Sequence, residues 1–214
     1  MTTPILYSFR RCPYAMRARM ALHEAAITVE IREVELNNKA EEFVTVSPKA
    51  TVPVLALGEK VLEESLDIML WALRNNDPSN WLLIPDAGFE LIDEADNEFK
   101  PALDHYKYST HYEDEDGIAA RQNGMVFLGK LDALLEGSDH LFAGQTSIAD
   151  IAIFPFVRQF ASVDKNWFNN QPWPNVIRWL NFALNSANFQ AVMQKYPRWT
   201  AGDPITLFPG NPDS

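Results

Sequence analysis

The sequence predicts two structural parts, a small α/β domain with a mixed sheet and an all-helical domain after it. Over the first seventy-five residues, apolar positions alternate between the period of a strand and that of a helix. Beyond them the period is helical throughout. The clearest linker signal, Asn75-Asn76-Asp77-Pro78-Ser79, separates the two patterns. We therefore expect a first domain over residues 1–77, a linker over 78–84 and a helical domain over 85–214.

The first part opens with a strand-helix-strand unit. Residues 5–8 and 28–36 have strand character, and a helix runs between them from Pro13 to about Ala26. Proline suits the first helical position because its missing N–H would have no partner there. Such a unit implies parallel strands with a right-handed crossover. A helix, a hairpin and a second helix complete a mixed four-stranded sheet, and they are expected over residues 38–46, 52–57 with 61–62, and 65–73.

The second part is predicted as a series of amphipathic helices. They are expected over residues 89–108, 116–136, 147–160, 174–186 and 188–195. Pro101 should kink the first of them. Ser147 and Asp150 have the spacing of a capping box at a helix start. The tail after Tyr196 is rich in proline and has no period, so we expect it to lie against the surface.

Composition argues against several classes of protein. With 47% apolar residues, the 214-residue chain can bury a sizeable core. Its apolar stretches are shorter than a membrane span and no signal peptide is visible at the start, so we expect a cytoplasmic protein with no membrane partner. The formal net charge of −11 opposes binding to nucleic acid. One cysteine, four histidines without ligand spacing and no nucleotide-binding motif lead us to expect neither a metal nor a cofactor.

The single cysteine lies in a basic island. Cys12 follows a strand and precedes Pro13 at the predicted helix start, and the arginines of this island precede the first acidic residue, Glu24; they are Arg10, Arg11, Arg17 and Arg19. Unpaired N–H groups, the helix dipole and neighbouring cations lower a thiol pKa from about 8.5 to roughly 3.5–7.5. We therefore predict a thiolate nucleophile at Cys12, supported by Arg11, Pro13 and Tyr14. The alternative is a small buried hydrophobe.

Two neighbouring features sharpen this prediction. Tyr7 and Ser8 are competing hydroxyl nucleophiles, but they lie at the strand end and are better explained by packing or backbone support. Ala15 stands where a Cys-x-x-Cys motif has its second cysteine. A mixed disulfide on Cys12 would then need an external thiol for its release, and glutathione is the abundant one in the cytosol.

The sequence resembles the cysteine-type glutathione transferases, most closely the omega class and the dehydroascorbate reductases. The resemblance is tight in the first domain and loose in the second, and it rests on Leu6-Tyr7-Ser8, Cys12-Pro13-Tyr14-Ala15, Leu36-Asn37-Asn38-Lys39-Ala40-Glu41, Ser47-Pro48-Lys49-Ala50-Thr51-Val52-Pro53-Val54-Leu55 and Glu63-Glu64-Ser65. It implies a thioredoxin-like first domain with a cis proline and an all-helical glutathione transferase domain after it. It also implies a structural role for Asp150.

The resemblance further implies a glutathione site. Val52, before the cis Pro53, would pair with the cysteinyl part of glutathione; Glu64 and Ser65 would hold the γ-glutamyl end, and Lys39 the glycyl end. For each there is a simpler alternative: an N-cap at Ser65, a solvated loop charge at Lys39 and a trans Val52-Pro53 bond. Ser47 and Lys49-Ala50 depart from the family pattern of this loop.

The function expected from these features is glutathione-dependent thiol transfer on a small electrophile or disulfide. Tyr106 and Tyr108, with Tyr112, are candidates for lining the electrophile pocket, and core packing or surface exposure is the alternative for these rings. The resemblance also implies a homodimer. Two other functions stay open, a non-catalytic binding or regulatory protein on the same fold and a monothiol two-domain glutaredoxin.

Overall fold

The computed structural model describes residues 3–109, 117–142 and 144–210, and it divides into two compact units. One unit comprises Met1–Ser79 with Ser186–Ser214, and the other comprises Asn80–Asn185. The last segment of the chain therefore belongs with the first unit, whereas we expected it within a helical domain over residues 85–214. Local periodicity shows that a segment is helical, but it does not show which neighbour that helix packs against.

The first unit is built on a five-stranded mixed sheet with the order β4-β3-β1-β2-β5. β1 (Ile5–Ser8) pairs in parallel with β2 (Val29–Glu33) and antiparallel with β3 (Val54–Leu57), which pairs with β4 (Lys60–Leu62). The predicted four strands and the parallel β-α-β unit are confirmed. The fifth strand, β5 (Leu207–Phe208), comes from the tail and pairs antiparallel with β2.

The tail after Tyr196 is largely exposed, as expected of a segment that lies against the surface, but part of it also joins the sheet. Phe208 is buried, and the backbone of Trp199 donates to the carbonyl oxygen of Glu33 at 3.0 Å. The two-residue strand is too short to show any alternation, so the sequence carries no signal for it. Its pairing covers an edge of β2 that would otherwise expose unpaired backbone groups.

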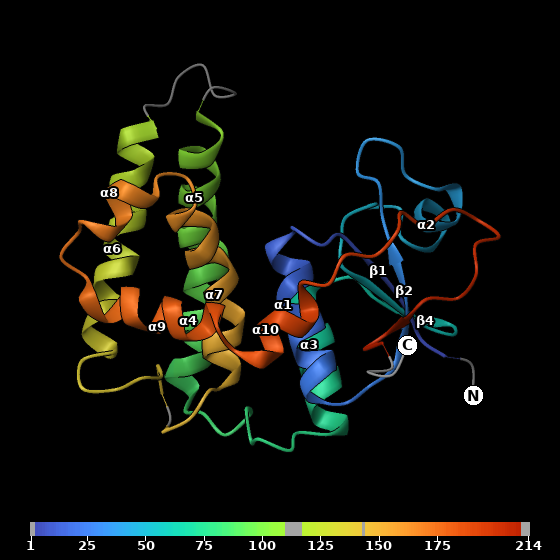
Figure 1. The fold of residues 1–214 in the computed structure, drawn as a ribbon, viewed down its shortest axis with the longest axis horizontal. Helices are drawn as coiled ribbons and strands as arrows, with labels where there is room; N and C mark the ends of the chain where they lie inside the picture. Colours follow the sequence, from blue (N-terminus) through green and yellow to red (C-terminus); the bar gives the residue numbers. More distant parts are fainter. Residues whose placement is uncertain (1–2, 110–116, 143, 211–214) are drawn as a thin grey trace. The chain divides into compact units, whose positions relative to one another are not determined.

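Helices cover both faces of this sheet, as Figure 1 shows. α1 (Pro13–Glu24) and α3 (Ser65–Asn75) lie together on one face, and α10 (Ala187–Val192) packs beside α1. The short α2 (Glu41–Val46) lies on the other face, where Phe43 is fully buried against Tyr7 and Val54. Both faces of the sheet are therefore covered. β1 and β3 are largely apolar, as suits strands covered on both sides, whereas β2 alternates apolar with charged residues.

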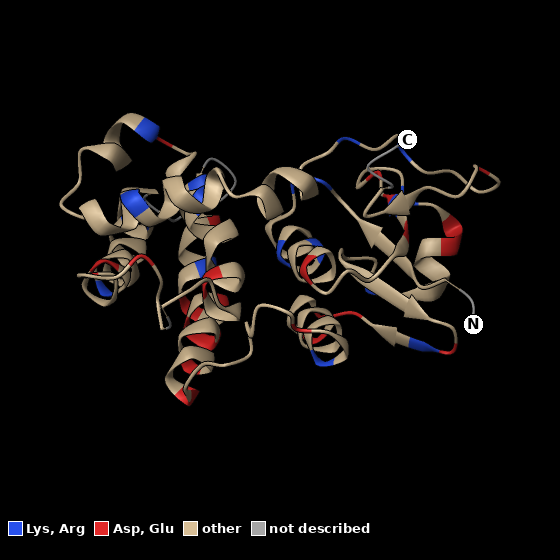
Figure 2. Cartoon of the chain, turned by 60° about the horizontal axis from the view of Figure 1, so that its bottom comes forward, with Lys and Arg blue, Asp and Glu red and all other residues tan. Residues whose placement is uncertain are grey.

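The second unit is all-helical. It contains α4 (Asp86–Glu94), the π-helix η1 (Ala95–Phe99), α5 (Lys100–Lys107), α6 (Gly117–Leu134), α7 (Ile148–Ala161), α8 (Lys165–Asn169) and α9 (Pro174–Leu184). α7 is apolar nearly all round and occupies the centre, with α4, α5, α8 and α9 against it. Acidic residues recur along α4 and η1; they are Asp86, Glu90, Asp93, Glu94, Asp96 and Glu98. Figure 2 colours the acidic positions of the chain red. These six residues supply part of the net negative charge.

The expected helix over residues 89–108 is interrupted by a π-turn rather than simply kinked. Pro101 stands in the first turn of α5, directly after η1. Proline has no N–H to donate to the carbonyl four residues earlier, and a wider turn is one way for a helix to accommodate this loss. Among the described residues no helix is long and apolar enough to cross a membrane.

Asp150 has the structural role expected of it. Its carboxylate accepts hydrogen bonds from the Ser147 N–H at 2.9 Å and from the Ser147 hydroxyl at 2.7 Å. It also accepts from the Leu141 N–H at 3.1 Å and from the Trp179 indole at 2.8 Å. One buried carboxylate therefore joins the start of α7, the preceding loop and α9.

Candidate thiol site

Cys12 lies at the start of α1, where the turn after β1 becomes helical. It is the N-cap residue, with extended backbone angles, and Pro13 occupies the first helical turn. The Cys12 N–H closes the turn by donating to the carbonyl oxygen of Phe9 at 3.0 Å. Its side chain is partly exposed and forms no disulfide. The thiol therefore lies where the unpaired N–H groups and the positive dipole end of α1 are found.

The thiol of Cys12 contacts the loop that leads into β3. Its Sγ donates to the carbonyl oxygen of Val52 at 3.6 Å, and the bond between Val52 and Pro53 is cis. The expected cis peptide is thus confirmed, and the trans alternative is wrong. The loop brings a backbone carbonyl from residue 52 beside a side chain from residue 12, although forty positions separate them.

The predicted γ-glutamyl residues lie at the start of α3. Glu64 is the N-cap of α3, and Ser65 is its first residue, so Ser65 is not the N-cap. Glu64 is exposed and pairs with Lys49 at 3.0 Å. Ser65 is buried, and its hydroxyl accepts from Nε of Arg17 at 3.0 Å. Since Arg17 comes from α1, this bond ties the helix that carries Cys12 to the start of α3.

Lys39 lies exposed between β2 and α2, and the structure places it in none of the contacts just described. The lysine that does contact Glu64 is Lys49, which is not among the residues predicted for the site. Its signal is only a departure from the family pattern in the loop before Val52. The assignment of Lys39 to the glycyl end stays a prediction.

The supporting residues of Cys12 differ from one another in their surroundings. Pro13 is buried, and the guanidinium of Arg17 lies 5.1 Å from the ring centroid of Tyr14. Arg11 is exposed, with its guanidinium 5.6 Å from the ring centroid of Phe9. Arg11 therefore faces solvent, whereas Tyr14 is linked through Arg17 to the start of α3.

The hydroxyl residues at the end of β1 are structural, as expected. Tyr7 is buried, its ring centroid lies 4.9 Å from that of Phe43, and its hydroxyl accepts from Arg32 at 2.9 Å. Ser8 is also buried, and its hydroxyl accepts from Arg19. These contacts use both hydroxyls within the fold.

The tyrosines expected in an electrophile pocket both lie in the helical unit. Tyr106 stacks within an aromatic cluster, with its ring centroid 5.0 Å from that of Phe160 and 6.4 Å from that of Trp167. The packing alternative therefore describes at least this ring. Tyr108 is 39% exposed, and its hydroxyl accepts from Lys107 at 2.8 Å. Tyr112 lies outside the described residues, and the pocket assignment stays a prediction.

No metal centre is found in the part of the chain that the structure describes. Within residues 3–109, 117–142 and 144–210, no three His, Cys, Asp or Glu side chains gather as metal ligands would. The Cys12 side chain instead contacts the backbone carbonyl of Val52.

A cysteine at a helix start, facing the residue before a cis proline on a mixed sheet, defines a thioredoxin-like domain, here combined with an all-helical unit. Residues 6–81 match the glutathione S-transferase N-terminal domain, and residues 116–181 match the glutathione S-transferase C-terminal domain. Together these matches cover about two thirds of the chain. The chain therefore belongs to the glutathione S-transferase family.

Individual relatives are distant. The chain is 31% identical over 74 residues to glutathione S-transferase DHAR3 of Arabidopsis thaliana, which covers 35% of this chain and only 28% of the relative's length. It is 25% identical over 168 residues to glutathione S-transferase omega-1 of Sus scrofa, covering 75% of this chain and 68% of that one. A crystal structure of a glutathione transferase from Pseudomonas putida, with one glutathione disulfide bound per subunit, has a TM-score of 0.77 at 22% identity, over 90% of this chain and 91% of that one. The last likeness establishes the fold.

Proposed function

We propose that this protein is a glutathione-dependent thiol transferase in which Cys12 forms a mixed disulfide with glutathione. The observation that carries the proposal is the position of Cys12 as the N-cap of α1, partly exposed and beside the carbonyl of Val52. A helix N-terminus favours a thiolate over a thiol, and the thiolate is the nucleophile. Relatives named DHAR3 and omega-1 support the cysteine type.

Glutathione would bind along the loop before β3 and the start of α3. Val52 would offer its backbone to the cysteinyl part, which brings the ligand's sulfur next to Cys12. The first N–H groups of α3 would receive the γ-glutamyl carboxylate beside Ser65, and Glu64 its ammonium. The glycyl carboxylate would pair with Lys39. The glutathione disulfide bound to the Pseudomonas putida protein shows that a related fold holds such a ligand.

The reaction is two thiol-disulfide exchanges. First the Cys12 thiolate attacks the glutathionyl sulfur of a mixed disulfide; the old S–S bond breaks, a Cys12–glutathione disulfide forms, and the substrate leaves as a thiolate that takes a proton. Then the thiolate of a second glutathione attacks the same sulfur, which releases glutathione disulfide and restores the Cys12 thiolate. Over the two steps, one free glutathione is consumed: the substrate leaves as a thiol, and its glutathionyl group leaves with the second glutathione as glutathione disulfide.

The second step must use an external thiol. Ala15, three residues after Cys12, is fully buried in α1, so no resolving cysteine occupies that place. Reduction of dehydroascorbate and removal of glutathione from conjugates belong to the same chemistry. Conjugation of glutathione to aromatic electrophiles should be weak, because a cysteine at this position favours disulfide exchange over activation of glutathione's own sulfur.

The test is the rate of Cys12 alkylation against pH, with and without pretreatment by glutathione disulfide. The proposal predicts a midpoint well below about 7.5. It also predicts one glutathione adduct by intact mass, which Cys12→Ser abolishes, and reduction of a glutathione mixed disulfide by wild type only. A midpoint at the free-thiol value without an adduct would leave a binding protein on this fold.

A further inference from the structure

The turn before Cys12 is held by hydrogen bonds to both backbone groups of Arg10, its N–H and its carbonyl oxygen. The Arg10 N–H donates to Oε1 of Glu33 at 2.7 Å. The carbonyl oxygen of Arg10 accepts from Nη2 of Arg19 at 2.8 Å. Glu33 lies at the end of β2 and Arg19 in the middle of α1. The strand and the helix therefore each hold one backbone group of Arg10 by a side-chain hydrogen bond.

Arg19 makes more contacts than this one. Arg19 is 1% exposed, and its guanidinium also donates to the hydroxyl of Ser8 and, at 3.4 Å, to the carbonyl oxygen of Phe9. From the other side, Nε donates to the carbonyl oxygen of Val192 at 3.2 Å, at the end of α10. One buried side chain therefore joins the turn before Cys12 to the C-terminal segment.

The groups around Arg19 shift its pKa in opposite directions. Four groups act on Arg19: the carboxylate of Glu33 from β2, Cys12 and Arg10 from the turn, and Tyr196 from the segment after α10. Burial lowers the pKa of Arg19 to about 10, and Glu33, Cys12 and Tyr196 act in the opposite direction. Burial also raises the pKa of Glu33, against the Arg10 N–H and the charges of Arg19 and Arg10.

Glu33 keeps one oxygen without a protein partner. Oε1 accepts from Arg10, but Oε2 is buried and makes no hydrogen bond with the described residues. A carboxylate that is partly desolvated and only half satisfied is costly to keep for stability alone. Because Glu33 lies beside the turn before Cys12, its charge can act on the groups of that turn.

We propose that Arg19 and Glu33 are positioning residues for Cys12, which hold the preceding turn between them and set the reactivity of the thiol by opposed charges. The C-terminal segment takes part in this arrangement because the Val192 carbonyl oxygen accepts the hydrogen bond from Nε of Arg19. This inference rests on the proposed function, because Arg19 and Glu33 would adjust the reactivity of a thiol that takes part in the reaction. Neither residue touches the reacting sulfur in the contacts described above.

The effect of Arg19 on the Cys12 thiol follows from the reciprocity of the interaction between their charges. A negative charge on Cys12 favours the charged form of Arg19, so the charged form of Arg19 must favour the Cys12 thiolate by the same free energy. Glu33 partly cancels the positive potential of Arg19 at the same place. Removing Arg19 should therefore weaken the thiolate, and removing the charge of Glu33 should strengthen it.

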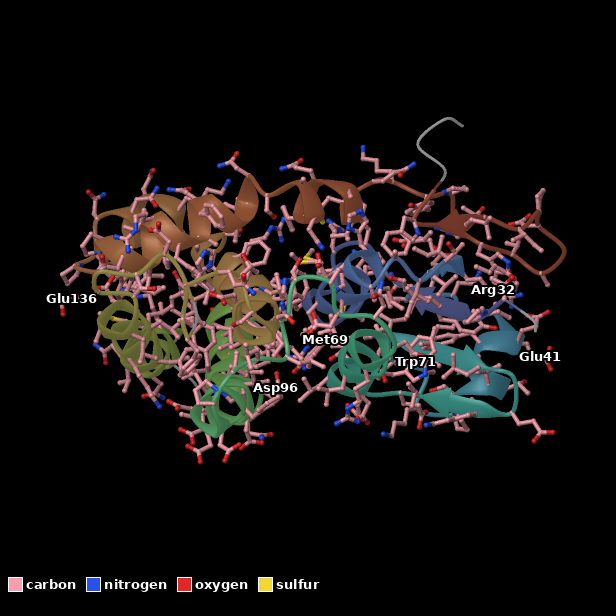
Figure 3. All side chains as sticks on the ribbon, turned by 90° about the horizontal axis from the view of Figure 1, so that it is seen from below. Arg32, Glu41, Met69, Trp71, Asp96 and Glu136 are labelled. Atoms are coloured by element: carbon pink, nitrogen blue, oxygen red, sulfur yellow. The ribbon has the colours of Figure 1, made fainter. Side chains whose placement is uncertain are left out.

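Three variants and one control separate this role from plain structural support. Arg19→Met removes the cation, Arg19→Lys keeps it with fewer hydrogen bonds, and Glu33→Gln keeps an acceptor for Arg10 without the charge. Arg32→Met is the control, because Arg32 is a half-buried arginine of the same strand as Glu33 (labelled in Figure 3). Its contacts are with Glu30, Tyr7 and Trp199.

The experiment is the pH midpoint of Cys12 alkylation in each folded variant, beside its melting temperature. We expect Arg19→Met to raise the midpoint by about one pH unit and Glu33→Gln to lower it by a similar amount. Arg19→Lys should lie near wild type, and so should Arg32→Met. If Arg19→Met does not fold, Glu33→Gln carries the test, since it replaces one carboxylate oxygen by an amide nitrogen at nearly constant shape.

The outcomes distinguish this inference from the proposed function. Opposite shifts for Arg19→Met and Glu33→Gln support the inference whatever the wild-type midpoint is. An unchanged midpoint in Glu33→Gln, or shifts of both variants in one direction, overturns it. A low wild-type midpoint with unchanged variants would overturn the inference alone, while a free-thiol midpoint in wild type would overturn only the proposed function.

Discussion

The indole nitrogen of Trp179 donates a hydrogen bond to the carboxylate of Asp150 at 2.8 Å, which joins α9 to the first turn of α7. Because the same carboxylate also holds Ser147 and Leu141, three separate segments of the helical unit depend on it. The central helix α7 therefore begins where these segments meet.

Asp150→Ala should destabilise the helical unit strongly. The substitution leaves several buried donors without an acceptor, and we expect a loss of about 3 kcal/mol or more in the free energy of unfolding. For a chain of this size that lowers the melting temperature by roughly 6–12 °C. Asp139→Ala is the control, since Asp139 is an exposed partner of Arg178. Equal melting temperatures for the two variants would contradict the capping role.

Two glycines of α6 should respond to alanine in opposite ways. A Cβ on Gly124 would lie 2.5 Å from the ring of Phe160, which packs among Phe99, Tyr106 and Trp167 and has little room to move. A Cβ on Gly129 meets nothing within 4 Å. Gly124→Ala should therefore destabilise by about 1–3 kcal/mol, and Gly129→Ala should stabilise by about 0.5–1 kcal/mol. Urea unfolding measures both, and two changes of the same sign would contradict the packing described.

The C-terminal tail should stabilise the first unit through Phe208. This residue is 1% exposed and belongs to β5 on the edge of the sheet. Phe208→Ala should cost about 3 kcal/mol of unfolding free energy. It should also speed amide hydrogen exchange in β2, because β2 pairs with β5. Ile205→Ala, at a side chain 69% exposed, is the matched control and should change neither quantity.

Glu64 should contribute to glutathione binding, whereas Glu59 should not. In the proposed site its carboxylate receives the ammonium of the γ-glutamyl end, so Glu64→Gln should weaken glutathione binding by about tenfold. The matched control is Glu59→Gln, in the exposed turn between β3 and β4. Isothermal titration with glutathione measures both. Equal affinities in the two variants would place the ligand elsewhere.

The buried carboxylate of Glu33 should make stability depend on pH. Burial raises its pKa in the folded state, so the folded protein binds this proton more tightly than the unfolded chain does. The stabilising contribution of the protonated form is fully present below the unfolded value of about 4.3. It is lost as the pH rises through the raised folded pKa.

The Glu33→Gln variant has an amide at this position, which does not titrate in this pH range. Its unfolding free energy should therefore improve relative to wild type as the pH rises from about 4 to about 7, in urea titrations at several pH values. Glu59→Gln reports the effect of losing any one carboxylate. A difference between Glu33→Gln and wild type that does not change with pH would contradict the burial of this charge.

Much of the fold was predictable because its signals are local. The period change near residue 75, the proline after Cys12 and the spacing of Ser147 and Asp150 each act within a few residues, and the structure confirms the elements they predict. The failures have equally physical reasons. A π-turn before Pro101 and a two-residue strand at Leu207–Phe208 leave no periodic trace.

The thiol site was predictable only in part. The sequence predicts Cys12 at a helix start, and the resemblance adds the cis bond at Val52-Pro53, both of which the structure contains. The basic island was expected to add positive potential at the sulfur, but the sequence could not show where each side chain points; in the structure Arg17 donates to Ser65, and Arg19 donates to the carbonyl oxygen of Arg10. A charge pattern predicts a potential, but the direction of each side chain depends on its packing.

By itself the sequence determined the two kinds of structural unit, the position of the single thiol and the absence of a second cysteine beside it. These properties follow from composition and short-range spacing. The tertiary structure alone decided that Lys49 meets Glu64, that Glu33 and Arg19 hold the same turn, and that the C-terminal segment joins the first unit. The bond from Arg19 to Val192 spans 173 positions of the chain. Such contacts arise from burial and close packing of remote segments, which no local pattern encodes.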